Sequence, residues 1–290
     1  MTENTPKITT VAIVIPARFG SSRFEGKPLA KIGSLTMLQH TCQTALDALE
    51  LLNTMSGSVK APSRISAKVI VATEDQRVFD HAACIHNITP VMTPDTCPTG
   101  SDRALSALEL LNIEPDIVVN LQGDAPFTPA HFISQIVQAL IGEPDCLVAT
   151  SAVALNWQEL DNFRENKKIT PFSGTSVIIN SKQNAVWFSK NIIPAIRKEE
   201  KYREKNKLSP VYQHIGLYGF KLNALRDFVK LQESTYEKLE GLEQLRLLEN
   251  GIDIHVETVT YGGHPVFPGI DTLEDLKRTE ALLKKSGRLV

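Results

Sequence analysis

The chain has 290 residues, of which 42% are hydrophobic and 22% are charged, and its formal net charge is -2. This length and composition allow a sizeable hydrophobic core, as in one large α/β domain. A net charge close to zero argues against a general nucleic-acid-binding protein, although it leaves room for a local basic pocket. No apolar run approaches the roughly 20 residues of a membrane span, and the polar N-terminus lacks the apolar core of a secretory signal. We expect a cytoplasmic protein that does not insert into membranes.

The first strand and the loop after it are the most informative stretch. The apolar run at residues 11–15 predicts a strand that is buried on both faces, as in a parallel sheet. Small residues and cations then alternate in the loop: Arg18, Gly20, Ser21, Ser22, Arg23, Gly26 and Lys27. Open backbone amides and nearby cations favour polyphosphate binding, and ligands of open α/β sheets bind after such a strand. An ordinary surface loop is the alternative, and the loop matches neither a Walker A nor a dinucleotide motif.

Alternating helix and strand patterns follow. Apolar periodicity predicts helices and strands in a βαβ arrangement, and the turn-rich residues 53–67 predict an exposed loop. The expected strands are 68–73, 91–92, 116–124 and 147–155, and the expected helices are 36–51, 104–111 and 129–141.

Two further loops carry candidate site residues. Thr99, Gly100 and Ser101 offer small donors, and Arg103 is a cation at a helix start, where it is unfavourable unless an anion is bound. This loop is either a substrate contact or a plain connection. Asp124 ends an apolar strand, where a carboxylate needs water, a cation or a metal. It is either a Mg²⁺ ligand facing the polyphosphate loop or a turn aspartate.

The second half has shorter strands, expected at 176–180, 185–189 and 211–220, and a helix at 239–250 that stops at Gly251. In the strand at 211–220, His214 and Tyr218 lie on one side and could face a hydroxyl-rich ligand or form part of a core. The mixed charges at 197–207 predict a solvated face or a mobile loop. Thr272 should cap a last helix, which leaves Asp271 available for another role.

Five motifs resemble, in order and spacing, those of the 3-deoxy-manno-octulosonate (Kdo) cytidylyltransferases: I-P-A-R-F-G-S-S-R-F-E-G-K-P-L, L-Q-G-D-A-P, H-I-G-L-Y-G-F, L-E-Q-L-R and G-I-D-T-L-E-D-L. The resemblance implies an α/β fold of the nucleotide-diphospho-sugar transferase type, a Rossmann-like mixed sheet flanked by helices. It implies one domain, 1–290, with a nucleotide-binding half (8–155) and a smaller sugar-binding and dimerisation half (156–290).

By this resemblance, the enzyme joins CMP from CTP to Kdo or a close ulosonic acid for lipopolysaccharide synthesis, uses Mg²⁺ and forms a homodimer. The implied catalytic residues are Arg18, Lys27, Asp124 and Asp271, with both aspartates as metal ligands. The implied nucleotide-binding residues are Arg18, Ser21, Arg23, Lys27, Thr99, Gly100, Ser101 and Arg103. The implied substrate-binding residues are Gln122, His214, Tyr218, Glu243 and Gln244.

Four positions depart from the family pattern. Glu25 stands for proline, Ala125 for glutamate, Ser176 for lysine and Lys190 for arginine. These changes leave open whether the sugar is Kdo, an 8-amino analogue or another ulosonic acid. The alternatives are an acylneuraminate-type cytidylyltransferase, which shares the first loop, and a nucleotide-binding module without catalysis.

Overall fold

The computed structural model describes residues 8–20, 24–56, 64–262, 267 and 269–285. The chain forms two compact units, each assembled from separate segments. Unit 1 comprises residues 1–137, 219–226 and 261–290, and unit 2 comprises residues 138–218 and 227–260. The predicted halves, residues 8–155 for nucleotide binding and 156–290 for sugar binding and dimerisation, are defined by function and not by contacts. This division by function stays a prediction.

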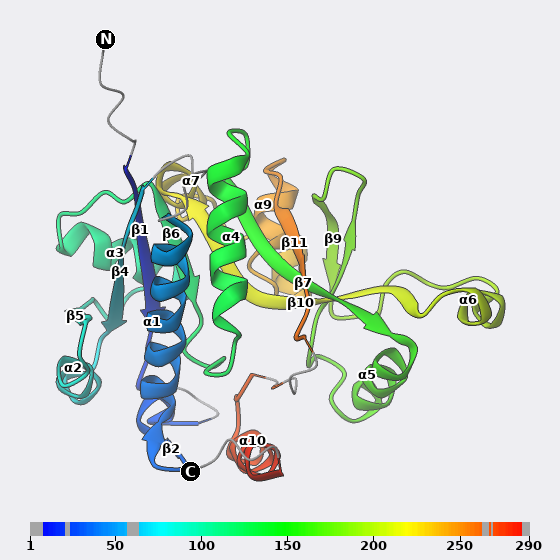
Figure 1. Cartoon of the computed structure of the whole chain (residues 1–290), viewed down its shortest axis with the longest axis horizontal. Helices are drawn as coiled ribbons and strands as arrows, with labels where there is room; N and C mark the ends of the chain where they lie inside the picture. The colour runs from blue at the N-terminus through cyan, green and yellow to red at the C-terminus, as the bar shows by residue number, and fades with distance from the viewer. Residues whose placement is uncertain (1–7, 21–23, 57–63, 263–266, 268, 286–290) are drawn as a thin grey trace. The chain divides into compact units, whose positions relative to one another are not determined.

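A parallel sheet forms the centre of unit 1 (Figure 1). Its strands are β1 (Ile8–Pro16), β4 (Arg64–Thr73), β5 (Ile88–Met92) and β6 (Ile117–Leu121), in the spatial order β6-β1-β4-β5. β1 pairs in parallel with both β4 and β6. Ile13, Val14 and Ile15 of β1 are fully buried, so the apolar run that predicted a strand covered on both faces is confirmed.

Helices and short elements complete unit 1. α1 (Met37–Ser56) packs along β1 and β4, and α3 (Gly100–Leu110) packs against β1, β4 and β6. The others are η1 (Lys27–Leu29), the hairpin β2 (Lys31–Ile32) and β3 (Leu35–Thr36), α2 (Gln76–Ala83) and α10 (Leu273–Lys285). Among the helices of the described ranges, none has the length and apolarity that a membrane crossing requires.

The strand order reverses at β1. From β1 the chain passes through α1 to β4 and through α2 to β5 on one side, whereas α3 carries it back to β6 on the other side. Ligands of open α/β sheets bind at the carboxyl ends of strands where the order reverses in this way. Pro16 and Leu121 are the last residues of β1 and β6, so the two loops with the strongest sequence signals begin at this edge.

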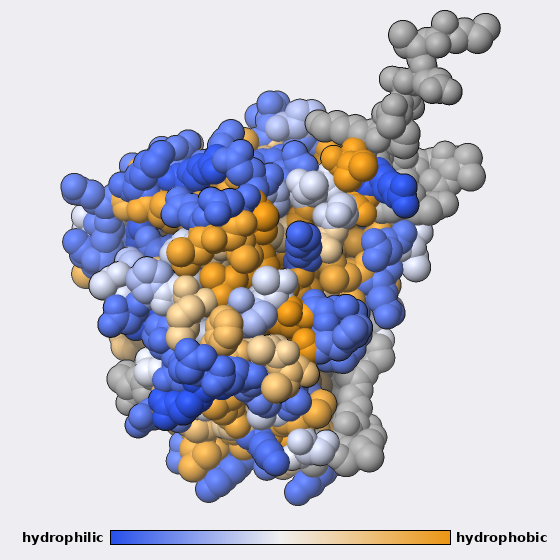
Figure 2. Space-filling view, turned by 90° about the vertical axis from the view of Figure 1, so that its left-hand side faces the viewer, coloured by the Kyte–Doolittle hydropathy of each residue, from blue (hydrophilic) through white to orange (hydrophobic). Residues whose placement is uncertain are grey.

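The surface on the α2 and β5 side of unit 1 has hydrophobic areas bounded by hydrophilic residues (Figure 2). Met92, at the end of the edge strand β5, and Leu110, at the end of α3, are 40% and 53% exposed. Apolar residues commonly contribute to the exposed surface of folded proteins, so these two exposures indicate no site by themselves.

Unit 2 contains the order β11-β7-β10, in which β11 (His255–Val259) and β7 (Val148–Asn156) are parallel. β8 (Ser176–Ile179) pairs with β10 and with β9 (Ala185–Ser189) in antiparallel fashion. α5 (Trp157–Ile169), α6 (Glu199–Lys205), α8 (Thr235–Glu240) and α9 (Leu245–Glu249) also belong to this unit. Three elements have residues in both units: α4 (Ala130–Gly142), β10 (Leu208–Lys221) and α7 (Leu222–Phe228).

The single helix predicted at residues 239–250 is wrong, because α8 and α9 are separate helices. Gly241 caps α8 with a φ of 63°, and its N–H donates to the carbonyl of Glu237 over 2.8 Å. Glycine adopts this left-handed conformation without steric cost, so it ends a helix here. The sequence analysis also missed α5 and made the 53–67 loop too long, since α1 extends to Ser56 and β4 starts at Arg64; residues 57–63 lie outside the described ranges.

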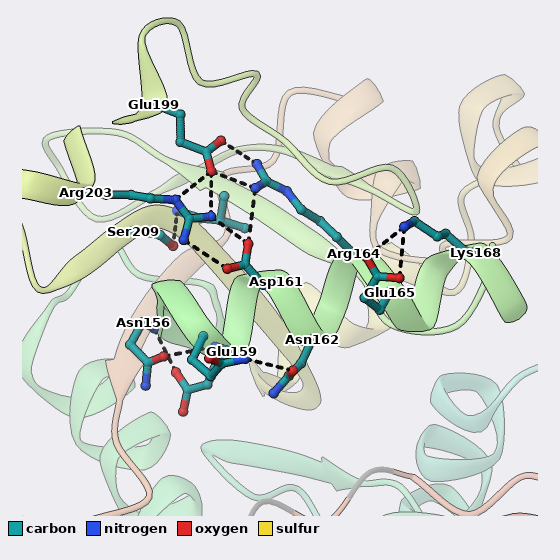
Figure 3. A network of polar contacts seen from close by, with 12 residues as sticks. Asn156, Glu159, Asp161, Asn162, Arg164, Glu165, Lys168, Glu199, Arg203 and Ser209 are labelled. Atoms are coloured by element: carbon teal, nitrogen blue, oxygen red, sulfur yellow. Dashed lines mark hydrogen bonds and ion pairs between the residues drawn. The ribbon is translucent and has the colours of Figure 1, made fainter. Parts of the chain in front are cut away.

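The charged run at residues 197–207 contains α6, which is fixed to α5 by ion pairs (Figure 3). Arg203 donates to both carboxylate oxygens of Asp161, at 2.6 and 2.9 Å, and to Glu199. Arg164 donates two bonds to Glu199, at 2.7 and 2.8 Å. The Arg203 guanidinium also lies 4.7 Å from the ring centroid of Trp157. The run is therefore a largely solvated face, as the first predicted alternative had it, whereas the mobile-loop alternative is corrected to an ordered helix held by a charge network.

This network predicts an acid-sensitive attachment of α6. The hydrogen bond from Arg164 is the main reason why the pKa of Glu199 falls from 4.5 to about 2. A lowered pKa stabilises the folded protein above the ordinary pKa, and this stabilisation is lost as the pH falls through the folded-state value. Trp187→Phe leaves Trp157 as the one tryptophan of the sequence, and its ring lies beside Arg203 of α6. The tryptophan fluorescence of this variant should change between pH 4.5 and about 2.

The control for this titration is Glu199→Gln in the same Trp187→Phe background. Its neutral amide cannot titrate, so the emission change in this pH range should be smaller. An equally large change in both variants would show that Glu199 does not govern the attachment.

Candidate functional site

Lys27 links two carboxylates that are remote in the sequence. Its Nζ lies 3.4 Å from Oδ2 of Asp124 and 3.2 Å from Oδ1 of Asp271. The side chain of Lys27 is 15% exposed, whereas those of Asp124 and Asp271 are 38% and 45% exposed. The structure thus brings together three of the residues named from the sequence, with both carboxylates accessible to a ligand.

Backbone contacts explain how Asp271 reaches this position. The N–H of Ile270 donates to the carbonyl of Asp124 over 2.8 Å. Thr272 and Asp275 form the expected capping box at the start of α10, because Oδ2 of Asp275 accepts from Thr272 N–H and Thr272 Oγ1 accepts from Asp275 N–H, at 3.0 and 3.2 Å. Thr272 and Asp275 therefore provide the cap, and the Asp271 carboxylate is directed to Lys27.

Two glycines allow the strand ends to approach each other closely. A methyl group on Gly123 would lie 2.8 Å from the carbonyl oxygen of Pro16, which is too close for any larger residue without a backbone shift. A methyl group on Gly100 would lie 3.4 Å from the Pro16 ring and 3.6 Å from the side-chain amide of Gln122. The loop before α3, the residues after β6 and the end of β1 are thus immediate neighbours, as the sequence motifs predicted.

The fold itself uses several polar groups of the loop before α3. Thr99 Oγ1 donates to Asp102 Oδ2 over 2.6 Å and accepts from the Asp102 N–H, so this pair caps α3. Ser101 is buried and accepts a bond from Asn120 Nδ2 over 3.3 Å. These bonds have a structural purpose, and nucleotide contacts by Thr99, Gly100 and Ser101 stay a prediction.

Arg103 is fully buried. Its Nη1 lies 3.1 Å from Oε2 of Glu74 and donates to Oγ1 of Thr93 over 2.6 Å. The expectation that an anion offsets this cation is met by a carboxylate of the protein itself. A direct nucleotide contact by Arg103 stays a prediction. In the structure, Arg103 pairs with Glu74 and Thr93.

The structure describes only part of the loop after β1. Arg18 is exposed, and Ser21 and Arg23 lie outside the described residues. The pKa of the Arg77 guanidinium is raised mainly by its hydrogen bond to Asp75, and the nearby charge of Glu25 adds to the effect. The unusual Glu25 thus lies near a cation of α2, which offsets part of the negative charge that it adds beside the loop.

The predicted sugar-binding residues of β10 lie together in unit 2. The ring centroids of His214 and Tyr218 are 5.4 Å apart, and Phe188 packs edge-on against His214. Burial, and to a smaller extent the charge of Lys190, lower the pKa of His214 to about 3, so the ring is neutral at pH 7. Because Thr150 Oγ1 donates to the carbonyl of Leu217, Nε2 of His214, 2.9 Å from this hydroxyl, is the donor in that contact.

Glu243 and Gln244 lie between α8 and α9 rather than within a helix. Burial is the main reason why the pKa of Tyr218 is raised, and the negative charge of Glu243 contributes next, which places the two groups within electrostatic range. Gln244 is 7% exposed, and within the described ranges its Nε2 has no hydrogen-bond partner. A buried amide of this kind is costly unless water or a ligand satisfies it, so it is suited to a polar ligand.

Two of the unusual residues are close to this cluster. Ser176 is fully buried, and its hydroxyl donates to the carbonyl of Asn191 over 2.6 Å. The N–H of Lys190 donates to Glu240 over 2.7 Å. Burial lowers the pKa of Lys167 to about 8, and the charge of Lys190 adds to this effect. Ser176 therefore stabilises, through its bond to Asn191, the turn that contains Lys190. Lys190 lies within electrostatic range of both Lys167 and His214.

The sequence analysis did not name Glu74 as a residue of this region. Asp75 does cap α2 by accepting from the Arg77 N–H over 2.9 Å. Glu74 instead accepts from the N–H of Phe19 in the first loop over 3.0 Å. The available signal was its position just after a strand that neighbours β1.

Comparisons with known proteins agree with this geometry. A family described as cytidylyltransferase matches residues 12–254. A 3-deoxy-manno-octulosonate cytidylyltransferase of Maricaulis maris is 39% identical over 97% of this chain and 100% of its own length. A protein of the same name from Polynucleobacter asymbioticus is 34% identical over 96% of this chain and 97% of its own.

A solved structure of a CMP:2-keto-3-deoxy-manno-octonic acid synthetase, complexed with CTP, is similar with a TM-score of 0.74. It is 30% identical in sequence, and the match covers 96% of this chain and 100% of that chain. The five ordered motifs, the strand order that reverses at β1 and these full-length similarities agree, and the chain belongs to the 3-deoxy-manno-octulosonate cytidylyltransferase family of enzymes.

Proposed function

We propose that this protein transfers CMP from CTP to the anomeric hydroxyl of Kdo or a close ulosonic acid, releases pyrophosphate, and so serves lipopolysaccharide synthesis. The observation that carries the proposal is the convergence of Lys27, Asp124 and Asp271 beside the carboxyl ends of β1 and β6. The names of the similar proteins, which include Kdo cytidylyltransferases and a structure with CTP, support the choice of substrates. The homodimer and the cytoplasmic location remain predictions.

Asp124 and Asp271 fit a Mg²⁺ site. Both carboxylates approach the same ammonium group, so together they form a place for a cation. Mg²⁺ in nucleotide sites typically takes one or two protein carboxylates and completes its shell with phosphates and water. The ion would neutralise charge on the triphosphate and ease deprotonation of the sugar hydroxyl.

The remaining chemistry can be assigned to side chains of this chain. Lys27 and Arg18 would stabilise the negative charge that builds up on the α-phosphoryl group and on the departing pyrophosphate. The attack is a direct in-line displacement by the sugar hydroxyl, so no covalent enzyme intermediate is needed.

In unit 2, the neutral His214, the buried hydroxyl of Tyr218 and the amide of Gln244 would bind hydroxyl groups of the sugar acid. Hydrogen-bonding groups in a partly buried cluster discriminate strongly against analogues that lack a hydroxyl partner. Glu243 and Gln122 complete the proposed set of sugar-binding residues.

A substrate panel tests the proposal. Pyrophosphate release should require CTP, Mg²⁺ and a ulosonic acid, and kcat/KM should be highest for Kdo or its 8-amino analogue. A preference for N-acetylneuraminate would favour the acylneuraminate alternative. CTP binding with no turnover on any of these acids would favour a module that only binds nucleotides.

Asp124→Asn and Asp271→Asn should each reduce kcat/KM for pyrophosphate release by about 100-fold or more, because each removes an anionic metal ligand. Both side chains are more than one-third exposed, so thermal unfolding should hardly change. The matched control is Asp227→Asn, which alters an aspartate that is 71% exposed and paired with Lys230. Near-normal turnover in either site variant would contradict the metal assignment.

Lys27→Met should separate the two roles of the ammonium group. CTP should bind about tenfold more weakly, equivalent to ~1.4 kcal/mol, because a phosphate contact is lost. Without CTP, Mg²⁺ should bind more tightly to this variant in calorimetry, because Asp124 and Asp271 lose their cationic partner. Lys27→Arg is the control that keeps the charge. Unchanged Mg²⁺ affinity in Lys27→Met would mean that the metal binds elsewhere.

A further inference from the structure

The loop after β1 is held by the segment after β4. The Ala17 N–H donates to the carbonyl of Ala72 over 2.9 Å, which continues the sheet beyond Pro16. Oε1 of Glu74 then accepts from the N–H groups of Phe19 and Gly20, at 3.0 and 3.5 Å. The composition of this loop predicted that its backbone amides bind an anion. Two of these amides bind the carboxylate of Glu74.

A buried cation fixes this carboxylate. Arg103 is fully buried, and its Nη1 lies 3.1 Å from Oε2 of Glu74. The same nitrogen donates to Thr93 Oγ1 over 2.6 Å and contacts the carbonyl of Pro94 at 3.4 Å. A guanidinium without solvent needs a counter-charge, and Glu74 supplies it, so the position of its carboxylate is set from the side of α3.

The ring of Phe19 is held in addition. The Arg77 guanidinium lies 3.5 Å from the centre of this ring, and two bonds to Asp75, at 2.7 and 3.0 Å, orient it. The Phe19 carbonyl accepts from the Gly26 N–H over 2.9 Å, and a methyl group on Gly26 would lie 3.1 Å from the ring. The start of the loop and the residue just before Lys27 are thus tied to one another at Phe19.

We infer that Glu74, held in place by Arg103, is a positioning residue that sets the conformation of the triphosphate-binding loop. The inference rests on the proposed function for the identity of the ligand. Glu74 occupies the N–H groups of Phe19 and Gly20, so these amides do not bind the phosphates. The side chains of Arg18 and Lys27 bind the phosphate oxygens instead. The effect on nucleotide binding that we infer for Arg103 acts through Glu74 and is separate from any direct contact.

The test compares wild type with two variants that both lack the buried Arg103 cation. Arg103→Met removes the cation and keeps the Glu74 acceptor, whereas Glu74→Met with Arg103→Met removes both without leaving a buried unpaired charge. In hydrogen exchange, peptides that cover residues 17–20 should exchange faster in both variants than in wild type, and fastest in the double variant. CTP affinity without sugar acid should be about tenfold lower in the double variant than in wild type, and KM for the sugar acid should differ by less than about twofold.

A control and two outcomes complete the experiment. Glu114→Met with Arg226→Met removes another ion pair of unit 1, which is 2.6 Å long, and should leave exchange at residues 17–20 and CTP affinity unchanged. Wild-type exchange at residues 17–20 and wild-type CTP affinity in the double variant would overturn the inference. A wild-type protein that binds CTP but releases no pyrophosphate with any ulosonic acid would overturn the proposed function alone, because the exchange and affinity differences would still support the positioning role.

Discussion

The parallel pairing of β1 with β4 and β6 is the constraint on which the site depends. Its register aligns Pro16 with Ala72 and Val14 with Asn120. Parallel strands end at a common edge of the sheet, so three loops leave it together. One loop supplies Lys27, the second supplies Glu74 and the third supplies Asp124. The local chemistry follows from that alignment.

Burial separates the charges that maintain the fold from those that are suited to chemistry. Arg103 has no exposed surface and pairs with Glu74, so its charge is committed to the structure. Lys27 contacts two carboxylates that remain partly exposed, so its partners can be exchanged when a ligand enters. Arg103 and Lys27, which were both named as nucleotide-binding residues from the sequence, therefore have different roles, which their residue types alone do not reveal.

The sequence was sufficient for the strands of unit 1 and for the convergence of distant site residues. An unbroken apolar run identifies β1, and the capping box at Thr272 correctly leaves Asp271 for another partner. Local patterns failed where a tertiary contact decides the outcome. Gly241 ends α8 although leucines continue the helical period beyond it, and Glu199 and Arg203 of α6 form ion pairs with α5 that no local pattern indicates. Glu74 was overlooked because its partners, Phe19 and Arg103, are distant along the chain.

The last helix has a consequence for biosynthesis. Asp271 follows Lys27 by 244 residues, and it is carried by a segment whose Ile270, Leu276 and Leu283 pack with Ile32 and Met37. While the ribosome is still making this segment, the parallel strands of unit 1 have already been synthesised, but Lys27 has one of its two acidic partners. A nascent chain therefore acquires its second acidic ligand only after residue 271 has been synthesised, when the packing of α10 against the start of α1 closes the core beneath it.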